Sequence, residues 1–242
     1  MEPLTHLPIV TGFQMAAVDR AMVEVCGLDL VQVMEVAGRA VASVARILQP
    51  TGTVAVLCGS GGNGGDGFVC ARHLVGWGFD ACCWPVKPVD EYHGLAAHNL
   101  RVCQRIGVPI SVPGDRIEFD GVDLIIDGLF GFGLSAAPSG RAVQLIEAAS
   151  CAPARVLAID IPSGIDATTG RAHGAALSAI ATLTLGLPKR GLLIEDGPTH
   201  AGTVIVADIG IPAAAYAAAG IPITSSFDSV EFVTLDGHPW PD

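Results

Sequence analysis

Short runs of apolar, often β-branched residues alternate along this chain with longer stretches in which apolar residues recur at helical spacing. Continuous apolar runs are typical of strands that are buried on both faces of a sheet. They predict strands at residues 53–58, 80–86, 108–112, 122–127, 155–161, 180–185 and 202–208. The helical spacing predicts helices at residues 14–26, 29–48, 66–77, 93–106, 139–150 and 172–179, with Asp29 as an N-cap of the second.

This alternation of strand and helix predicts the α/β class. Successive βαβ units give a mostly parallel, Rossmann-like sheet with helices on both faces, which is a three-layer αβα sandwich. The chain shows no internal repeat and no linker, so we expect a single domain over residues 1–242. The segment from about residue 222 to 242 is polar and contains proline, and we expect it to pack loosely.

The composition of the chain argues against several classes of protein and of binding partner. The formal net charge is −11, with 13 Lys and Arg against 24 Asp and Glu, which gives no basic patch for nucleic acid. No apolar run reaches the length of a membrane span, and the N-terminus lacks the pattern of a secretory signal. The seven cysteines form no C-x-x-C pair and the seven histidines show no paired spacing. We therefore expect reduced thiols, no zinc site and a cytoplasmic location.

The glycine-rich segment 59–67, which reads GSGGNGGDG, follows the first predicted strand and leads into a predicted helix. Such a segment is either a tight turn or a ligand loop. Glycines let a ligand approach the backbone amides, and the start of a helix offers unpaired N–H groups to an anion. A plain turn does not need the side chains of Asn63 and Asp66, so the sequence favours the ligand loop.

Aspartates end two further predicted strands, at Asp127 and Asp160, and each is followed by a glycine-containing turn. Ligands of open parallel sheets bind outside the carboxyl ends of the strands. Each aspartate alone could be an ordinary strand-end residue, but three such endings in one chain indicate a common site. Lys189 follows the strand at 180–185 and either reaches the same edge or lies in a solvated turn.

These motifs resemble the NAD(P)H-hydrate epimerase family, the YjeF N-terminal domain. The family pattern G-x-G-N-N-G-G-D-G is matched at residues 59–67 except at Gly62, and the segments at 33–38, 127–134, 158–164, 182–189 and 201–212 resemble further family motifs in the same order. The resemblance extends from about residue 14 to 212 and lacks the dehydratase domain that is fused to many members. It implies a stand-alone epimerase that interconverts the R and S forms of hydrated NADH and NADPH (NADHX and NADPHX).

The resemblance also implies a site, residue by residue. Asp160 would be the catalytic residue and would contact the reacting end of the substrate. A potassium ion would be the cofactor, held by Asn63, Asp127 and Ser163, all of which offer oxygen atoms that suit a hard cation. The substrate would lie along two segments and Asp160, on Gly62, Asn63, Gly64, Gly65 and Asp66, and on Gly131, Phe132, Gly133, Leu134, Ser135, Ala136 and Ala137. The only partners we expect are the small-molecule substrate and a second copy in a homodimer, with no nucleic acid and no membrane.

The chain departs from the family at Gly62, where the first asparagine of a pair is expected, and at Ala136 and Ala137, where a basic residue is expected. These departures favour an alternative function, a ligand-binding or scaffold module of the same fold that has lost catalysis. A second alternative is a nicotinamide dehydrogenase, which would have an acidic residue at the end of its second strand. That strand instead runs into Pro85 and Val86, which argues against it.

Overall fold

The computed structural model describes residues 7–112, 114, 116–221, 223, 227 and 230–241. Within these residues a sheet of seven strands has the order β2-β1-β3-β4-β5-β6-β7, and all neighbouring strands are parallel except β6 and β7. The strands are β1 (Thr53–Cys58), β2 (Asp80–Pro85), β3 (Leu124–Gly128), β4 (Arg155–Ile159), β5 (Ala181–Leu185), β6 (Thr203–Ala207) and β7 (Phe232–Thr234).

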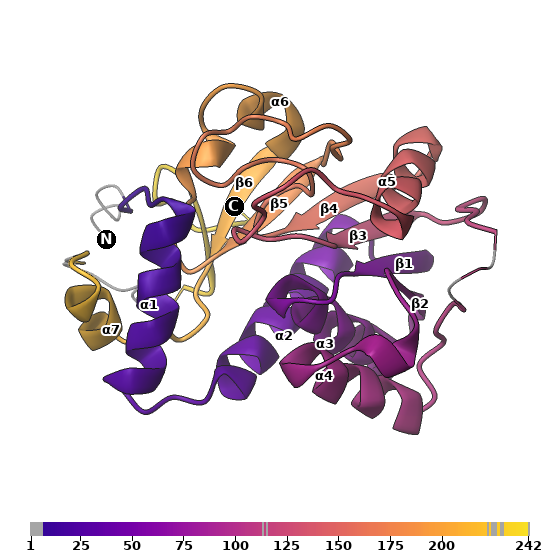
Figure 1. Cartoon of the computed structure of the whole chain (residues 1–242), viewed down its shortest axis with the longest axis horizontal. Helices are drawn as coiled ribbons and strands as arrows, with labels where there is room; N and C mark the ends of the chain where they lie inside the picture. The colour runs from indigo at the N-terminus through magenta and orange to yellow at the C-terminus, as the bar shows by residue number, and fades with distance from the viewer. Residues whose placement is uncertain are drawn as a thin grey trace.

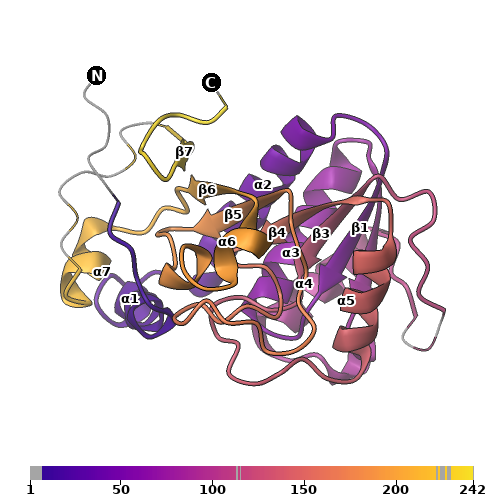
Figure 2. The same ribbon diagram turned by 90° about the horizontal axis from the view of Figure 1, so that it is seen from above.

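Helices cover both faces of this sheet, as Figures 1 and 2 show. The helices α2 (Leu30–Leu48), α3 (Gly62–Gly76) and α4 (Gly94–Arg105) pack on one face, and α5 (Arg141–Cys151) packs on the other. Helices α1 (Gly12–Glu24) and α7 (Ala213–Ala218) lie side by side near the β6 end of the sheet, and α6 (Gly197–Ala201) is a short helix before β6. Two 3₁₀ turns, Val89–Glu91 and Arg190–Leu192, complete the set. The predicted three-layer fold is confirmed.

Alternate residues of each central strand fill the two layers of the core. In β1, Val54 and Val56 pack with the helices α2 and α3, whereas Ala55 and Leu57 pack with Leu145 and the rest of α5. Because both faces are covered, the strands need no polar side, and this is why they appear in the sequence as continuous apolar runs. None of the described helices is long and apolar enough to cross a membrane.

Each of the two N-terminal helices begins with a capping box. Asp29 accepts a hydrogen bond from the Val31 amide, while the Gln32 side chain accepts one from the Asp29 amide, which together form a capping box. Thr11 and Gln14 make the same arrangement at the start of α1. The prediction of Asp29 as an N-cap is therefore confirmed.

Three expectations from the sequence are wrong. The segment 108–112 forms only an isolated bridge between Ile110 and Cys83, because Pro109 has no N–H to donate to a ladder. The segment 172–179 is not a helix, because Gly174 has a φ of +83° and the Leu177 amide donates to Ser163 instead of to its own segment. Part of the supposedly loose tail forms the antiparallel strand β7, whose Phe232 and Val233 are buried, although residues 222, 224–226, 228, 229 and 242 lie outside the described part.

The order β2-β1-β3 creates a switch point, because the chain leaves β1 toward β2 and later returns to the opposite side of β1 with β3. In open parallel sheets, ligands bind in the crevice at such a point, outside the carboxyl ends of the strands. The segments that follow β1 and β3 are residues 59–61 and 129–134, both singled out in the sequence. The topology thus brings the two glycine-containing segments to one crevice.

Candidate functional site

A cavity of about 590 Å³ opens at this edge of the sheet. Its walls come from segments far apart in the chain: α1 and α2, the start of α3, the start of α4, residues 129–134, Asp160, and the end of β5 with Lys189. One side is apolar and includes Met15, Met22, Leu30, Val33 and Met34. Polar side chains also line the cavity, at Asp19, Asn63, Asp66, Asp160 and Lys189. A mostly apolar cavity with a few converging polar groups is typical of a small-molecule site.

The glycine-rich segment is the first part of helix α3 rather than a loop before it. The helix begins at Gly62, with Gly61 as an N-cap that offers no side chain, and not at residue 66 as the sequence predicted. The amides of the first turn therefore lack both intrahelical acceptors and a side-chain cap. The positive end of this helix faces the cavity at Gly61, Gly62 and Asn63, so the structure supports an anion-binding role for this segment.

The glycines of this segment have two different roles. A Cβ at Gly64 would lie 1.8 Å from the Gly59 carbonyl oxygen, and a Cβ at Gly65 would lie 2.5 Å from the Met34 sulfur. These two glycines allow α3 to pack closely against the end of β1 and against α2, and neither lines the cavity. A Cβ at Gly62 would meet nothing within 4 Å. Gly62 is therefore open to the cavity, whereas Gly64 and Gly65 are required for packing.

Asp160 follows the last residue of β4 in a left-handed backbone conformation, with a φ of +66°. Aspartate tolerates this conformation better than most residues, and the Asp160 amide is held by a hydrogen bond to the Leu183 carbonyl at 2.8 Å. The turn aims the carboxylate at the cavity. Its Oδ2 accepts a hydrogen bond from the Phe132 amide at 3.2 Å, which ties Asp160 to the segment after β3.

Lys189 reaches the same site, which confirms the interpretation that it lies at this edge of the sheet and not in a solvated turn. Its side chain is fully buried, and its Nζ lies 2.5 Å from Asp160 Oδ1 and 2.6 Å from the Leu185 carbonyl oxygen. A residue far away in the sequence holds the backbone on both sides of Lys189. The Val10 amide donates to the Pro188 carbonyl, and the Arg190 amide donates to the Val10 carbonyl. Lys189 is also the one lysine or arginine among the described residues that line the cavity.

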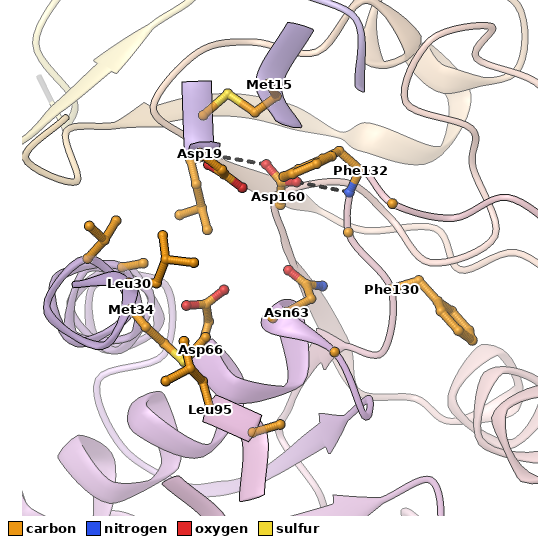
Figure 3. A pocket seen from close by; sticks show the side chains of 18 of the residues that line it. Met15, Asp19, Leu30, Met34, Asn63, Asp66, Leu95, Phe130, Phe132 and Asp160 are labelled. Carbon is orange, nitrogen blue, oxygen red and sulfur yellow. Dashed lines mark hydrogen bonds between the residues drawn. The ribbon is translucent and has the colours of Figure 1, made fainter. Parts of the chain in front are cut away.

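Two further carboxyl groups line the cavity, at Asp19 and Asp66. Burial is the main cause that raises the pKa of Asp19, to about 6, with Lys189 lowering it and Asp160 raising it. Burial and then the nearby charges of Asp160 and Asp19 raise the pKa of Asp66 well above its ordinary value. Figure 3 shows Asp19 beside Asp160 and Phe132, and Asp66 projecting from α3 on the other side of the opening. Asp19 was not predicted as a site residue, because nothing in the local sequence of α1 shows that this helix covers the strand ends.

Asp127 and Ser163 lie in contact with each other, close to the cavity but not among its lining residues. Asp127 accepts hydrogen bonds from the Ser163 hydroxyl at 2.6 Å and from the Ser163 amide at 2.7 Å. Burial raises the pKa of Asp127 to about 6, and the bonds from Ser163 oppose that effect. Asn63 stands in the cavity wall, where its Nδ2 donates to the Ile159 carbonyl at 3.2 Å.

The predicted segment 131–137 divides into two parts. Gly131, Phe132, Gly133 and Leu134 line the cavity, whereas Ser135, Ala136 and Ala137 are exposed and are not among its lining residues. A Cβ at Gly131 would lie 3.2 Å from both Asn63 Oδ1 and Asp160 Oδ2, so glycine brings this backbone close to both side chains. Ala136 lies outside the cavity wall, so the lack of a basic residue there removes no group that would line the cavity.

Comparisons with known proteins identify a family and several relatives. The family described as YjeF-related protein N-terminus matches residues 30–191. An NAD(P)H-hydrate epimerase of Rhodopirellula baltica is 34% identical, and the alignment covers 88% of each chain. A bifunctional NAD(P)H-hydrate repair enzyme of Salinibacter ruber is 37% identical over 85% of this chain, which spans 41% of that longer protein. The yeast protein YNL200c has the same fold, with a TM-score of 0.76 at 22% identity, covering 94% of this chain and 100% of its own.

Proposed function

The chain belongs to the family of YjeF-related protein N-termini, and from this premise we propose that it is an NAD(P)H-hydrate epimerase. This isomerase interconverts the R and S forms of hydrated NADH and NADPH and so takes part in the repair of damaged nicotinamide nucleotides. The observation that carries the proposal is the position of Asp160. Its carboxylate lies in the wall of the switch-point cavity, beside the helix start that would hold the diphosphate.

The chemistry of the substrate explains why such a carboxylate is needed. The hydrate carries its hydroxyl group on the ring carbon next to N1, so this carbon is a hemiaminal. The nitrogen can expel the hydroxyl as water once an acid protonates it, which leaves a planar iminium ion. Water then adds to the ring carbon and gives up a proton to a base. A positioned carboxyl group serves these proton transfers, and such catalysis typically contributes about 10²–10⁴-fold.

The arrangement of the cavity supports one orientation of the substrate. The diphosphate would lie against the amides at the start of α3 and along Gly131, Gly133 and Leu134, where the helix dipole favours an anion. The reduced nicotinamide ring would lie at Asp160, near the aromatic ring of Phe132 and the apolar wall of α1 and α2.

We also propose that Asn63, Asp127 and Ser163 hold a potassium ion. Their side chains offer only oxygen atoms to an ion, which suits a hard cation, and no described lysine, arginine or histidine pairs with the buried Asp127 carboxylate. The Oδ1 atom of Asn63 accepts no hydrogen bond from any described residue, so it is available to a ligand. When bound, the ion supplies positive charge to neutralise Asp127 and the diphosphate.

The seven cysteines are all unpaired, which fits a reducing compartment, and we propose a cytoplasmic location. The decisive test of the function is incubation of the purified protein with a single epimer of hydrated NADH, without ATP, followed by chiral separation. We expect the R form to reach equilibrium with the S form much faster than in buffer. A rate equal to that of the buffer control would show that this chain is a binding module without catalytic activity.

A further inference from the structure

Epimerisation moves a hydroxyl group from one face of the nicotinamide ring to the other. A planar iminium ion can be attacked from both faces, but a single carboxyl group is fixed on one face only. Such a group removes and returns the hydroxyl on its own side, and the original epimer is formed again. Inversion while the ring stays bound therefore requires a second proton-transfer group on the opposite face.

The cavity holds three carboxyl groups, at Asp19, Asp66 and Asp160. Asp19 and Asp160 lie next to each other at the same side of the opening, so together they serve one face of a bound ring (Figure 3). Asp66 projects from helix α3, across the opening from Asp160. Of the three, only Asp66 is placed to act with Asp160 from the other side.

The surroundings of Asp66 suit a proton donor. The residue is 8% exposed, and no described residue donates a hydrogen bond to its carboxyl group or forms an ion pair with it. An ionised carboxylate in such a place would be costly, because burial without a partner disfavours the charged form. The raised pKa of Asp66, caused by burial and by the charges of Asp160 and Asp19, agrees with this argument. Asp160 differs, because the Lys189 ammonium group lies 2.5 Å from its Oδ1 atom.

We propose that Asp66 is the second catalytic carboxyl group of this enzyme and acts on the ring face opposite Asp160. The inference rests on the proposed function. In one direction the Asp66 carboxyl donates its proton to the ring hydroxyl on its face, the C–O bond breaks, and water leaves. A second water attacks the opposite face and gives its proton to the Asp160 carboxylate as the new C–O bond forms. The proton on Asp160 then returns to Asp66 through solvent, which restores both groups for the next turnover. In the reverse direction the two groups exchange roles, and no oxidant, reductant or further reactant is consumed.

The test uses water labelled with ¹⁸O and the Asp66→Asn variant. The wild-type protein should incorporate the label and invert the ring carbon together. The variant should invert at least about 100-fold more slowly. It should still incorporate label, without inversion, into the epimer whose hydroxyl faces Asp160. Asp160→Asn should show the complementary pattern and incorporate label only into the other epimer.

Two controls separate catalysis from structure. Asp19→Asn makes the same change in the same cavity, beside Asp160, and should slow exchange and inversion by the same factor. Thermal unfolding should give the same Tm for Asp66→Asn and wild type, since asparagine has nearly the same volume and no described residue forms an ion pair with Asp66 that the change would break. Asp66→Ser is a second neutral variant should Asp66→Asn fold poorly.

The outcomes are distinct. Loss of inversion with retained exchange on one epimer supports the role of Asp66. Equal loss of exchange and inversion in a folded Asp66→Asn protein, or no loss of either, overturns it while leaving the epimerase function intact. If the wild-type protein neither exchanges nor inverts faster than buffer, the proposed function itself is wrong and the role of Asp66 falls with it.

Discussion

Asp160 Oδ1 lies 2.5 Å from Lys189 Nζ, and the side chains of both residues are almost completely excluded from solvent, at 4% and 1% exposure. Two buried charges of opposite sign stabilise each other only as a pair, because each alone would bear the full cost of desolvation. The carboxylate that faces the substrate is thus also part of the structural core at this edge of the sheet. Substitutions here should change both catalysis and stability.

Asp160→Asn should lower the rate of epimerisation by at least about 100-fold, because the carboxamide cannot transfer a proton. Asparagine accepts the left-handed backbone at this position, so the turn itself should persist. The free energy of unfolding should nevertheless fall by about 3–5 kcal/mol, because Lys189 is left buried without a partner. Urea unfolding and a turnover assay on the same preparation measure both effects. A variant with near wild-type turnover would remove Asp160 from the mechanism.

The double variant Asp160→Asn/Lys189→Met should be more stable than Asp160→Asn alone. Removing the second charge eliminates the unpaired ammonium group, and methionine fills a similar volume. Activity should stay as low as in Asp160→Asn, since the carboxylate is still missing. A double-mutant cycle of unfolding free energies checks this coupling. Additive losses from the two single substitutions would contradict a stabilising pair.

Gly64→Ala and Gly62→Ala should have different consequences, although the two glycines are only two positions apart. The new methyl group at residue 64 would collide with the Gly59 carbonyl, and the free energy of unfolding should fall by at least about 2 kcal/mol. At residue 62 the methyl group meets no protein atom, so stability should change by less than about 0.5 kcal/mol. Substrate affinity should fall in Gly62→Ala if the diphosphate contacts the helix start closely. Urea unfolding and a binding titration distinguish the two roles.

Potassium should raise the Tm of the protein more at pH 7.5 than at pH 5. A cation binds the ionised form of Asp127, and that form becomes dominant only above the raised pKa of about 6. Thermal unfolding in potassium chloride, with sodium chloride at the same ionic strength as the control, measures the effect. Asp127→Asn should abolish the difference between the two salts. An equal response to both salts in the wild-type protein would argue against the proposed site.

Three buried carboxyl groups should make the free energy of unfolding fall as the pH rises from about 4 to 7. The pKa values of Asp19 and Asp127 rise to about 6 on folding, and that of Asp66 rises well above its ordinary value, so these groups bind more protons in the folded state. The pKa values of Glu35 and Asp166 are lowered on folding, and their opposite contribution is confined to the acid end of this range. Stability contributed by the protonated groups is complete below their unfolded pKa and is lost as the pH passes the folded value. Asp66→Asn should flatten this decline. An unchanged slope in urea unfolding at several pH values would show that Asp66 is ionised in the folded protein.

The strands of the central sheet could be predicted from the sequence because burial on both faces leaves a continuous apolar run. The run at 53–58, for example, coincides with β1. The glycine-rich segment could be located but its conformation was predicted wrongly. Six glycines have little intrinsic preference for a helix. Only the tertiary contacts of Gly64 and Gly65 with Gly59 and Met34 explain why the helix starts at Gly62.

The charged partners in the site were harder to predict, because each one depends on a distant segment. The sequence around Lys189 is that of a turn, and nothing within it shows that Asp160 lies 2.5 Å away. Asp19 sits on a helix whose own pattern only separates an apolar from a polar face. Its place in the cavity depends on how α1 packs over the strand ends, which is a property of the whole fold.

Through the short bridge between Val10 and Lys189, the N-terminal segment stabilises the backbone that carries the lysine of the ion pair. The backbone on both sides of the lysine is hydrogen-bonded to a residue that lies just before the first helix. A chain shortened past Val10 would lose both hydrogen bonds and leave the lysine backbone less restrained, although no residue of the cavity wall is removed. Shortened forms of this protein for activity measurements should therefore keep this segment.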